Sequence, residues 1–382
     1  MTNKEEKLIH YVESTYKKIS VVGTSNKEIK NYMDAWGHRI YIKNKDTFNL
    51  VHYIKSINYE YDELKENIVK VLRKHLEILE RAGILGIYKY TFDISRRKLI
   101  MNTTTIKENK DILIITLKYF KNKNVLMADS FSAKIIEFSI NDLYIFLNGI
   151  QKKLYKLVTV NNKYGDLVNE YLIFSPVTSA IITHEFFGHA FEYDNFLKIV
   201  KKVKYLHIPE YITVIDNPQL DLSGYCCFDD LGNILKSETI IKNGNINKLI
   251  TSSKYNGAVR QRAGEENVIT RVTNTVLLIN DQMKISENDL SYLRGIQIES
   301  VYNCFLKDDF VYINADACYF RCGKQLYNIG KRTLKINIVD FFYCIEAFYG
   351  NKNNYSSIDC IKKHEKCGGI GSVSNGLILK LV

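Results

Sequence analysis

The second half of the chain carries closely spaced runs of β-branched and aromatic residues, a pattern typical of β-strands. Two of these runs, 239–242 and 245–250, flank Asn243-Gly244, the dipeptide best suited to a type I′ hairpin because both of its residues need positive φ. Further strands are predicted at 211–215, 272–279, 310–319 and 334–344. Because strands follow strands with few helices between them, the sequence favours an antiparallel sheet over a parallel α/β core.

The first half of the chain mixes helices with strands. From Asp62 to Arg81 apolar residues recur at spacings of three and four, and Gly83 follows, which predicts an amphipathic helix with a C-terminal stop. A second helix is predicted at 141–157. Strands are predicted at 87–94, 112–120 and 125–131, the last two joined by a hairpin turn at 121–124.

A polar segment that contains glycine, residues 161–166, separates the two halves and predicts a domain boundary near residue 165. We therefore expect an α+β protein. Residues 1–165 would form an N-terminal domain of mixed helices and strands, and residues 166–382 a strand-rich antiparallel domain. A length of 382 residues agrees with two domains, because roughly 150 residues per domain is typical.

The net charge of +11 does not by itself predict a nucleic-acid partner, because the basic residues are scattered along the chain and do not cluster with aromatic residues. No Gly-rich phosphate loop is present. No run approaches the roughly 18 apolar residues that a membrane span needs, and the first residues resemble neither a secretory signal nor a transit peptide. The sequence thus predicts a cytoplasmic protein that binds neither nucleic acid nor membrane, with its eight cysteines kept as thiols.

One helical segment of the second half carries residues suited to chemistry. His184 and His189 lie five residues apart, and Glu185 directly follows the first histidine, an HExxxH pattern. On a regular α-helix five residues turn the second side chain roughly 140° away from the first. Both imidazoles can reach one ion only if the helix is locally widened, as in a single π-type turn, and Gly188 would ease that distortion.

Two histidines at this spacing also occur by chance as unrelated core or surface residues, so the wider sequence has to decide. The stretch from His184 to Asp194, HEFFGHAFEYD, resembles the signature of the TldD/PmbA family of metalloproteases. Later stretches are similar to further family landmarks in the same order: 213–216, 228–232, 270–275 and 366–372. Residues 34–39 match an early segment in outline, whereas 195–209 diverge and leave substrate preference open.

The resemblance implies a zinc metalloprotease whose metal is held by His184, His189 and Cys367, the cysteine of a Cys-Gly loop. A thiolate and two neutral imidazoles suit zinc, and one coordination position stays open for water. His364 and Glu192 are alternative third ligands. Glu185 is then the predicted general base, which takes a proton from the attacking water and returns it to the leaving amine.

Other residues near the motif have two readings each. Glu192 and Asp194 could orient the histidines or simply be solvated. Arg271 and Asn274 could bind the backbone of a peptide, or could pin the end of a strand.

Unfolded or small modified peptides, bound as an added strand, are the expected substrates. The resemblance also implies a two-subunit assembly, a homodimer or a heterodimer with a paralogue, in which this chain would be the TldD-like catalytic subunit. The competing hypothesis is a non-catalytic partner subunit or peptide-binding scaffold.

Overall fold

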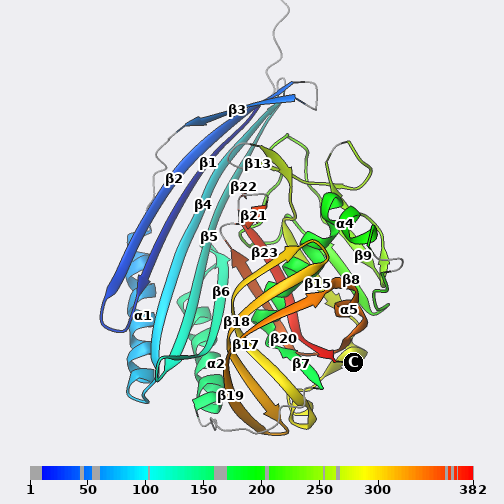
Figure 1. The fold of residues 1–382 in the computed structure, drawn as a ribbon. Coiled ribbons are helices and arrows are strands. Elements are labelled where there is room, and N and C mark those ends of the chain that lie inside the picture. The colour runs from blue at the N-terminus through cyan, green and yellow to red at the C-terminus, as the bar shows by residue number, and fades with distance from the viewer. Residues whose placement is uncertain are drawn as a thin grey trace, which may run out of the picture.

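The computed structural model describes residues 11–43, 47–53, 61–101, 104–158, 170–202, 206–252, 254–263, 267–357, 360–362, 365–367 and 369–381. Two large sheets lie side by side, one built from the N-terminal third of the chain and the other from the C-terminal half (Figure 1). The α+β class predicted from the sequence is confirmed. The predicted domain boundary near residue 165 falls outside the described residues and stays a prediction.

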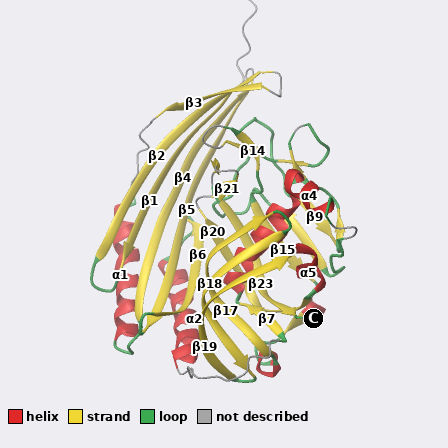
Figure 2. Ribbon diagram, in the orientation of Figure 1, coloured by secondary structure: helices red, strands yellow, loops and turns green. Residues whose placement is uncertain are grey.

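The N-terminal sheet has six antiparallel strands in the order β3-β2-β1-β4-β5-β6. Its strands are β1 (Tyr11–Gly23), β2 (Glu28–Lys43), β3 (Thr47–Tyr53), β4 (Leu85–Met101), β5 (Thr104–Lys121) and β6 (Asn124–Lys134). Two helices, α1 (Asp62–Glu80) and α2 (Ile140–Val158), pack their apolar sides against this sheet (Figure 2). Both helices and the β5–β6 hairpin agree with the prediction, and Asn122 and Lys123 take positive φ in the turn.

The C-terminal sheet is mixed, with a main path of β10-β9-β8-β15-β23-β7-β17-β18-β19. The strands are β7 (Tyr171–Phe174), β8 (Ile212–Asp216), β9 (Glu238–Lys242), β10 (Asn245–Ile246), β15 (Asn274–Ile279), β16 (Lys284–Ile285), β17 (Arg294–Lys307), β18 (Phe310–Cys322), β19 (Gln325–Asn337), β20 (Ile345–Ser357) and β23 (Ile370–Lys380). Most pairs are antiparallel, as expected, but β15–β23, β7–β17 and β16–β20 are parallel. Asn243 and Gly244 both take positive φ between β9 and β10, as a type I′ turn requires.

Smaller elements surround this sheet. The short strands are β11 (Ile250–Thr251), β12 (Ala258–Val259), β13 (Gln261–Ala263), β14 (Val268–Thr270), β21 (Cys360–Lys362) and β22 (Glu365–Cys367). The helical segments are α3 (Pro176–Thr183), η1 (His184–Gly188), η2 (His189–Phe191), α4 (Tyr193–Val200), η3 (Asp281–Met283), η4 (Asp289–Tyr292) and α5 (Ile338–Tyr343).

The run 334–344, predicted as one strand, divides into the end of β19 and the helix α5. Asn337 causes the change, because its side chain accepts a hydrogen bond from the Val339 amide and caps the helix.

A buried ionic contact joins the two halves. Arg97 of β4 donates to Asp230 at 2.6 Å and to the carbonyl oxygen of Phe228 at 2.8 Å, while Lys110 of β5 donates to Asp93 and to the Ser223 carbonyl oxygen. The Arg97 side chain is 5% exposed, so these charges are held by precise partners rather than by water. The inner face of the N-terminal sheet is thereby fixed against the loops that surround the candidate site.

Candidate metal centre

The two histidines of the motif lie at the end of a buried helix. α3 is anchored to β23, because Ser179 and Ser374 are hydrogen bonded at 2.9 Å and Ser372 donates to the carbonyl oxygen of Ala180 at 2.6 Å. Beyond Thr183 the helix widens into the π-helical turn η1. This turn brings the imidazole rings of His184 and His189 to a centroid separation of 4.0 Å. The predicted π-type turn is confirmed.

Gly188 is required by packing rather than by its backbone angles. Its φ of −91° is accessible to any residue. However, a Cβ at this position would lie 2.7 Å from Thr275 Oγ1, closer than real Cβ contacts allow. The glycine therefore lets the π-turn lie directly on β15, which carries Thr275, and this contact keeps His189 facing His184.

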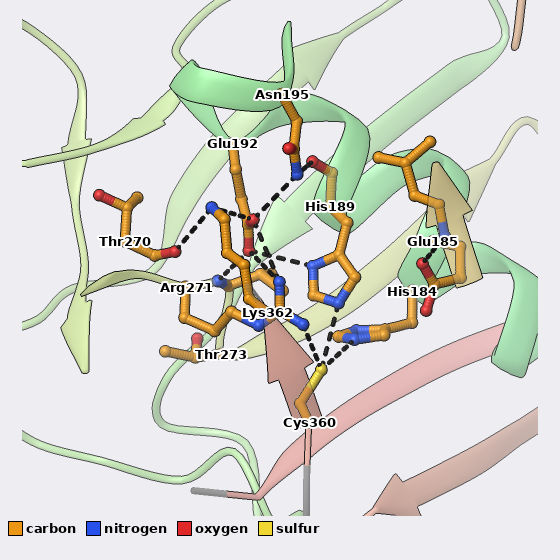
Figure 3. A network of polar contacts seen from close by, with 12 residues as sticks. His184, Glu185, His189, Glu192, Asn195, Thr270, Arg271, Thr273, Cys360 and Lys362 are labelled. Carbon is orange, nitrogen blue, oxygen red and sulfur yellow. Dashed lines mark hydrogen bonds and ion pairs between the residues drawn. The ribbon is translucent and has the colours of Figure 1, made fainter. Parts of the chain in front are cut away.

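A cysteine completes the group, and it is Cys360. The Cys360 sulfur lies 3.4 Å from His184 Nε2 and 3.2 Å from His189 Nε2 (Figure 3). All three ligand atoms lie within 4.8 Å of one another, and all three residues are buried. Two nitrogen atoms and one sulfur atom thus converge on a single point, an arrangement that can hold a metal ion.

The ligand set differs from the one that the sequence resemblance implied. Cys367 was expected as the third ligand, but it lies across the β21–β22 hairpin, opposite Cys360 in the register. Cys367 is 3% exposed, and burial raises the pKa of its thiol to about 11. Of the other candidates, Glu192 is placed behind His189, and His364 lies outside the described residues.

Glu192 holds the ring of His189 from behind. Its Oε1 accepts a hydrogen bond from His189 Nδ1 at 3.0 Å, so that Nε2 faces the sulfur. Glu192 is fully buried and also accepts from Arg271 at 3.2 Å and from Lys362 at 2.7 Å. Burial opposes its charge, but Arg271, His189 and Lys362 outweigh burial and hold the pKa of Glu192 well below its usual range. Glu192 is therefore an ionised carboxylate that fixes the orientation of His189.

Asp194 lies further out than Glu192, at the other side of Lys362. It accepts a hydrogen bond from Lys362 at 2.7 Å, and its side chain is 34% exposed. Lys362 thus bridges an inner carboxylate to an outer one. The sequence did not single out Lys362, because a lysine two residues from a cysteine carries no recognisable signal.

Arg271 lies inside the site. One guanidinium nitrogen approaches the Cys360 sulfur to 2.7 Å and the Ile361 carbonyl oxygen to 2.9 Å, while another contacts Glu192. Arg271 is 2% exposed. Burial acts to raise the pKa of Cys360, but Arg271 and His189 outweigh it, so the pKa is lowered. The position favours an arginine that holds the thiolate in place.

Asn274 has a different environment. It is fully buried, its Oδ1 accepts from the Gly224 amide, and its Nδ2 donates to the carbonyl oxygens of Asn217 and Leu220. These contacts use its amide to pin the segment 217–224 at the start of β15. Peptide binding by Arg271 or Asn274 stays a prediction, and the pinning alternative accounts for the contacts of Asn274.

Glu185 lies beside the metal-ligand group and faces a cleft of about 670 Å³. Its Oε2 accepts a hydrogen bond from the Leu306 amide of β17 at 2.9 Å. Burial raises the pKa of Glu185, although His189 and Arg271 act against it. The cleft is lined by both histidines, Cys360, and the end of β17 from Val301 to Lys307.

The two histidines differ in how readily they take up a proton. Burial, His189 and Arg271 together hold the pKa of His184 well below its usual value. Burial and Arg271 also act to lower the pKa of His189, but Glu192 and Cys360 outweigh them and raise it to about 9. A metal ion that binds here would therefore displace a proton from His189.

Comparison with known proteins places this site in a metallopeptidase context. Residues 169–361 match the family described as PmbA/TldA metallopeptidase C-terminal domain. A metalloprotease from Archaeoglobus fulgidus is 29% identical over 152 residues, which span 35% of this chain and only 35% of that relative.

The fold is also similar to solved structures. TldE from Thermococcus kodakarensis has a TM-score of 0.70 at 12% identity, with 98% of this chain and 96% of that chain covered. A candidate modulator of DNA gyrase from Thermotoga maritima has a TM-score of 0.68 at 10% identity, with 97% and 94% covered. At these identities the likeness concerns the fold alone.

Proposed function

Because the chain belongs to the PmbA/TldD metallopeptidase family, we propose that it is a zinc-dependent peptidase that cleaves unfolded or small modified peptides. One observation carries the proposal: His184, His189 and Cys360 converge beside the carboxylate of Glu185 at the base of a cleft. The family gives the reaction class, and these four side chains supply its chemical groups.

The ligand atoms have separations that suit zinc. A tetrahedral ion with bonds of about 2.0 Å to nitrogen and about 2.3 Å to sulfur separates the two atoms by about 3.5 Å. The observed separations of 3.2 and 3.4 Å between Cys360 Sγ and the two Nε2 atoms are close to this value. Three protein ligands leave a fourth position open toward the cleft, as catalytic rather than structural zinc requires. When bound, zinc would lower the pKa of a water molecule toward about 7 and polarise a peptide carbonyl.

Glu185 is the proposed general base. It directly precedes the widened part of the π-turn, so its carboxylate is carried on the same rigid segment as the two histidines. Its raised pKa brings it nearer to neutrality, where a base can both accept a proton and return it to the leaving amine. The hydrogen bond from the Leu306 amide fixes one carboxylate oxygen and leaves the other for the proton.

The end of β17 is the proposed peptide-binding edge. β7 pairs with β17 only from Gly295 to Ile298, whereas β18 pairs with it as far as Lys307. The Leu306 amide points to Glu185 and away from β18. An extended peptide could therefore pair with this edge and place a carbonyl group next to Glu185, with recognition of backbone rather than of sequence.

Glu185→Gln tests the mechanism. The amide keeps the size of the side chain but cannot accept a proton, so cleavage of a flexible peptide should slow by roughly two to four orders of magnitude while zinc stays bound. Asp308→Asn is the matched control, since it removes a second carboxylate of the cleft lining and should cleave at nearly the parent rate. If Glu185→Gln cleaves as fast as the parent, Glu185 is not the base.

The assembly of the active unit is a separate proposal. We infer a dimer, either of this chain or with a paralogous chain, on the basis of the family resemblance. The same peptide assay, run with and without an added paralogue, distinguishes the two. Cleavage only by the mixture would identify a heteromer, and no cleavage in any combination, with zinc bound, would favour a binding scaffold. No helix in the described ranges is long and apolar enough to span a membrane.

A further inference from the structure

The metal-ligand cysteine has a second cysteine directly opposite it. In the β21–β22 hairpin Cys360 pairs with Cys367, and Ile361 and Lys362 pair with Lys366 and Glu365. Both cysteines are buried, at 9% and 3% exposure, and neither is in a disulfide in this structure. The chain therefore places a second thiol beside the one that completes the metal centre.

The pairing has the dimensions of a disulfide. Directly opposed residues of an antiparallel pair have Cα atoms about 4.5 to 5.5 Å apart, and their side chains leave the ladder on the same face. Disulfides join residues whose Cα atoms lie about 4.4 to 6.8 Å apart. Cys360 and Cys367 thus can be bridged without a change of register.

We propose that Cys360 and Cys367 are the site of a reversible oxidative modification, a disulfide that forms with a peroxide as oxidant and removes the thiolate from the metal centre. The inference rests on the proposed function, because it takes Cys360 as a metal ligand. Cys360 has two exclusive uses: as a thiolate it completes the site with His184 and His189, and in a disulfide its sulfur is neutral and a poor ligand.

The chemistry balances with hydrogen peroxide alone. The Cys360 thiolate attacks one peroxide oxygen, the O–O bond breaks, and the products are a sulfenic acid and hydroxide, which takes up a proton to become water. The Cys367 thiol then attacks the Cys360 sulfur, forms the S–S bond, and releases a second molecule of water. Two thiols lose two electrons and one peroxide gains them. A dithiol reductant reverses the reaction through a mixed disulfide.

Cys360 rather than Cys367 is the thiol that meets the oxidant. It lines the cleft, whereas Cys367 is not among the residues that line it. The Arg271 guanidinium, 2.7 Å from the Cys360 sulfur, stabilises the anion that reacts. Cys367 has the complementary position behind it, that of a resolving thiol.

The test uses the full chain loaded with zinc and treated with hydrogen peroxide. We expect stoichiometric release of zinc to a chromogenic chelator, a mass lower by two hydrogen atoms, and a cross-link between Cys360 and Cys367 in a digest without reductant. Dithiothreitol followed by zinc should restore full metal content. Two controls accompany it: Cys367→Ser should keep zinc before treatment but lose reversibility, and Cys318→Ser, which removes a buried cysteine of β18, should behave as the parent.

The outcomes separate this inference from the proposed function. A Cys360→Ser variant that binds zinc as the parent does contradicts the ligand assignment, whatever the disulfide does. If the parent binds zinc but no Cys360–Cys367 cross-link forms, or if Cys367→Ser releases and regains zinc as reversibly as the parent, the switch is wrong while the metal site stands. Circular dichroism before and after treatment distinguishes loss of metal from unfolding.

Discussion

Replacing Glu192 with glutamine tests whether the buried carboxylate positions the metal ligand. The Oε1 position can keep its contacts, because an amide oxygen still accepts from His189 Nδ1 and from the Val272 amide. The Oε2 position would become an NH₂ group that faces the ammonium of Lys362 and the guanidinium of Arg271. Two charge-assisted contacts are lost, and donors then face donors.

The size of the effect follows from this division. Loss of one partner from a buried charge cluster costs about 3 to 5 kcal/mol of folding free energy. Loss of the group that orients a ligand histidine weakens metal binding about 10- to 100-fold, which is about 1.4 to 2.8 kcal/mol. We expect Glu192→Gln to show both effects, with zinc affinity measured by competition with a chelator and stability by chemical denaturation.

Asp194→Asn is the matched control. Asp194 accepts from the same lysine as Glu192 at the same distance, 2.7 Å, but it is partly exposed and is not bonded to a metal-ligand histidine in the printed contacts of the site. Its substitution should cost about 0 to 1 kcal/mol of stability and leave zinc affinity unchanged. Equal losses of zinc affinity in the two variants would refute the positioning role of Glu192.

Three further predictions concern other parts of the chain. Cys360→Ser should lose zinc, whereas Cys367→Ser should keep it, as read by metal content; the reverse result would restore the ligand set implied by the sequence. Gly188→Ala should lower both stability and zinc content, because its Cβ would meet Thr275 Oγ1, and an unchanged denaturation midpoint would contradict this. Burial lowers the pKa of His75 to about 4, so below pH 6.5 the unfolded chain takes up a proton that the folded chain excludes. Stability should therefore fall by roughly 3 kcal/mol from pH 6.5 to 4, and His75→Phe should flatten this dependence in denaturation at a series of pH values.

Local patterns in the sequence were enough to predict local structure. The helices at 62–80 and 140–158 follow from apolar spacing, and the turn at Asn243-Gly244 follows from its need for positive φ. The parallel pairs did not follow, because β15 pairs with β23, nearly a hundred residues later. Nothing in either segment alone encodes the direction of a partner that distant.

The candidate site was predictable to the extent that it is local. The spacing of five between His184 and His189 predicted the π-turn, since only a widened turn aims both rings at one point. The third ligand comes from a remote hairpin in which two cysteines lie opposite each other. Which of the two reaches the histidines depends on how the hairpin docks, and the sequence contains no local signal for that.

The docking of the hairpin has a physical explanation in the charges around Cys360. Arg271 holds the hairpin by its sulfur and by the Ile361 carbonyl oxygen, and Lys362 holds it by Glu192 and by the Thr270 carbonyl oxygen. These contacts all involve residues 360–362, on the first strand of the hairpin. Each buried charge is costly unless its partner is present, so the hairpin, the segment around Arg271 and the π-turn stabilise one another. The metal centre is therefore assembled from three distant segments as one cooperative unit, and its geometry depends on the ionic contacts behind the ligands as much as on the ligands themselves.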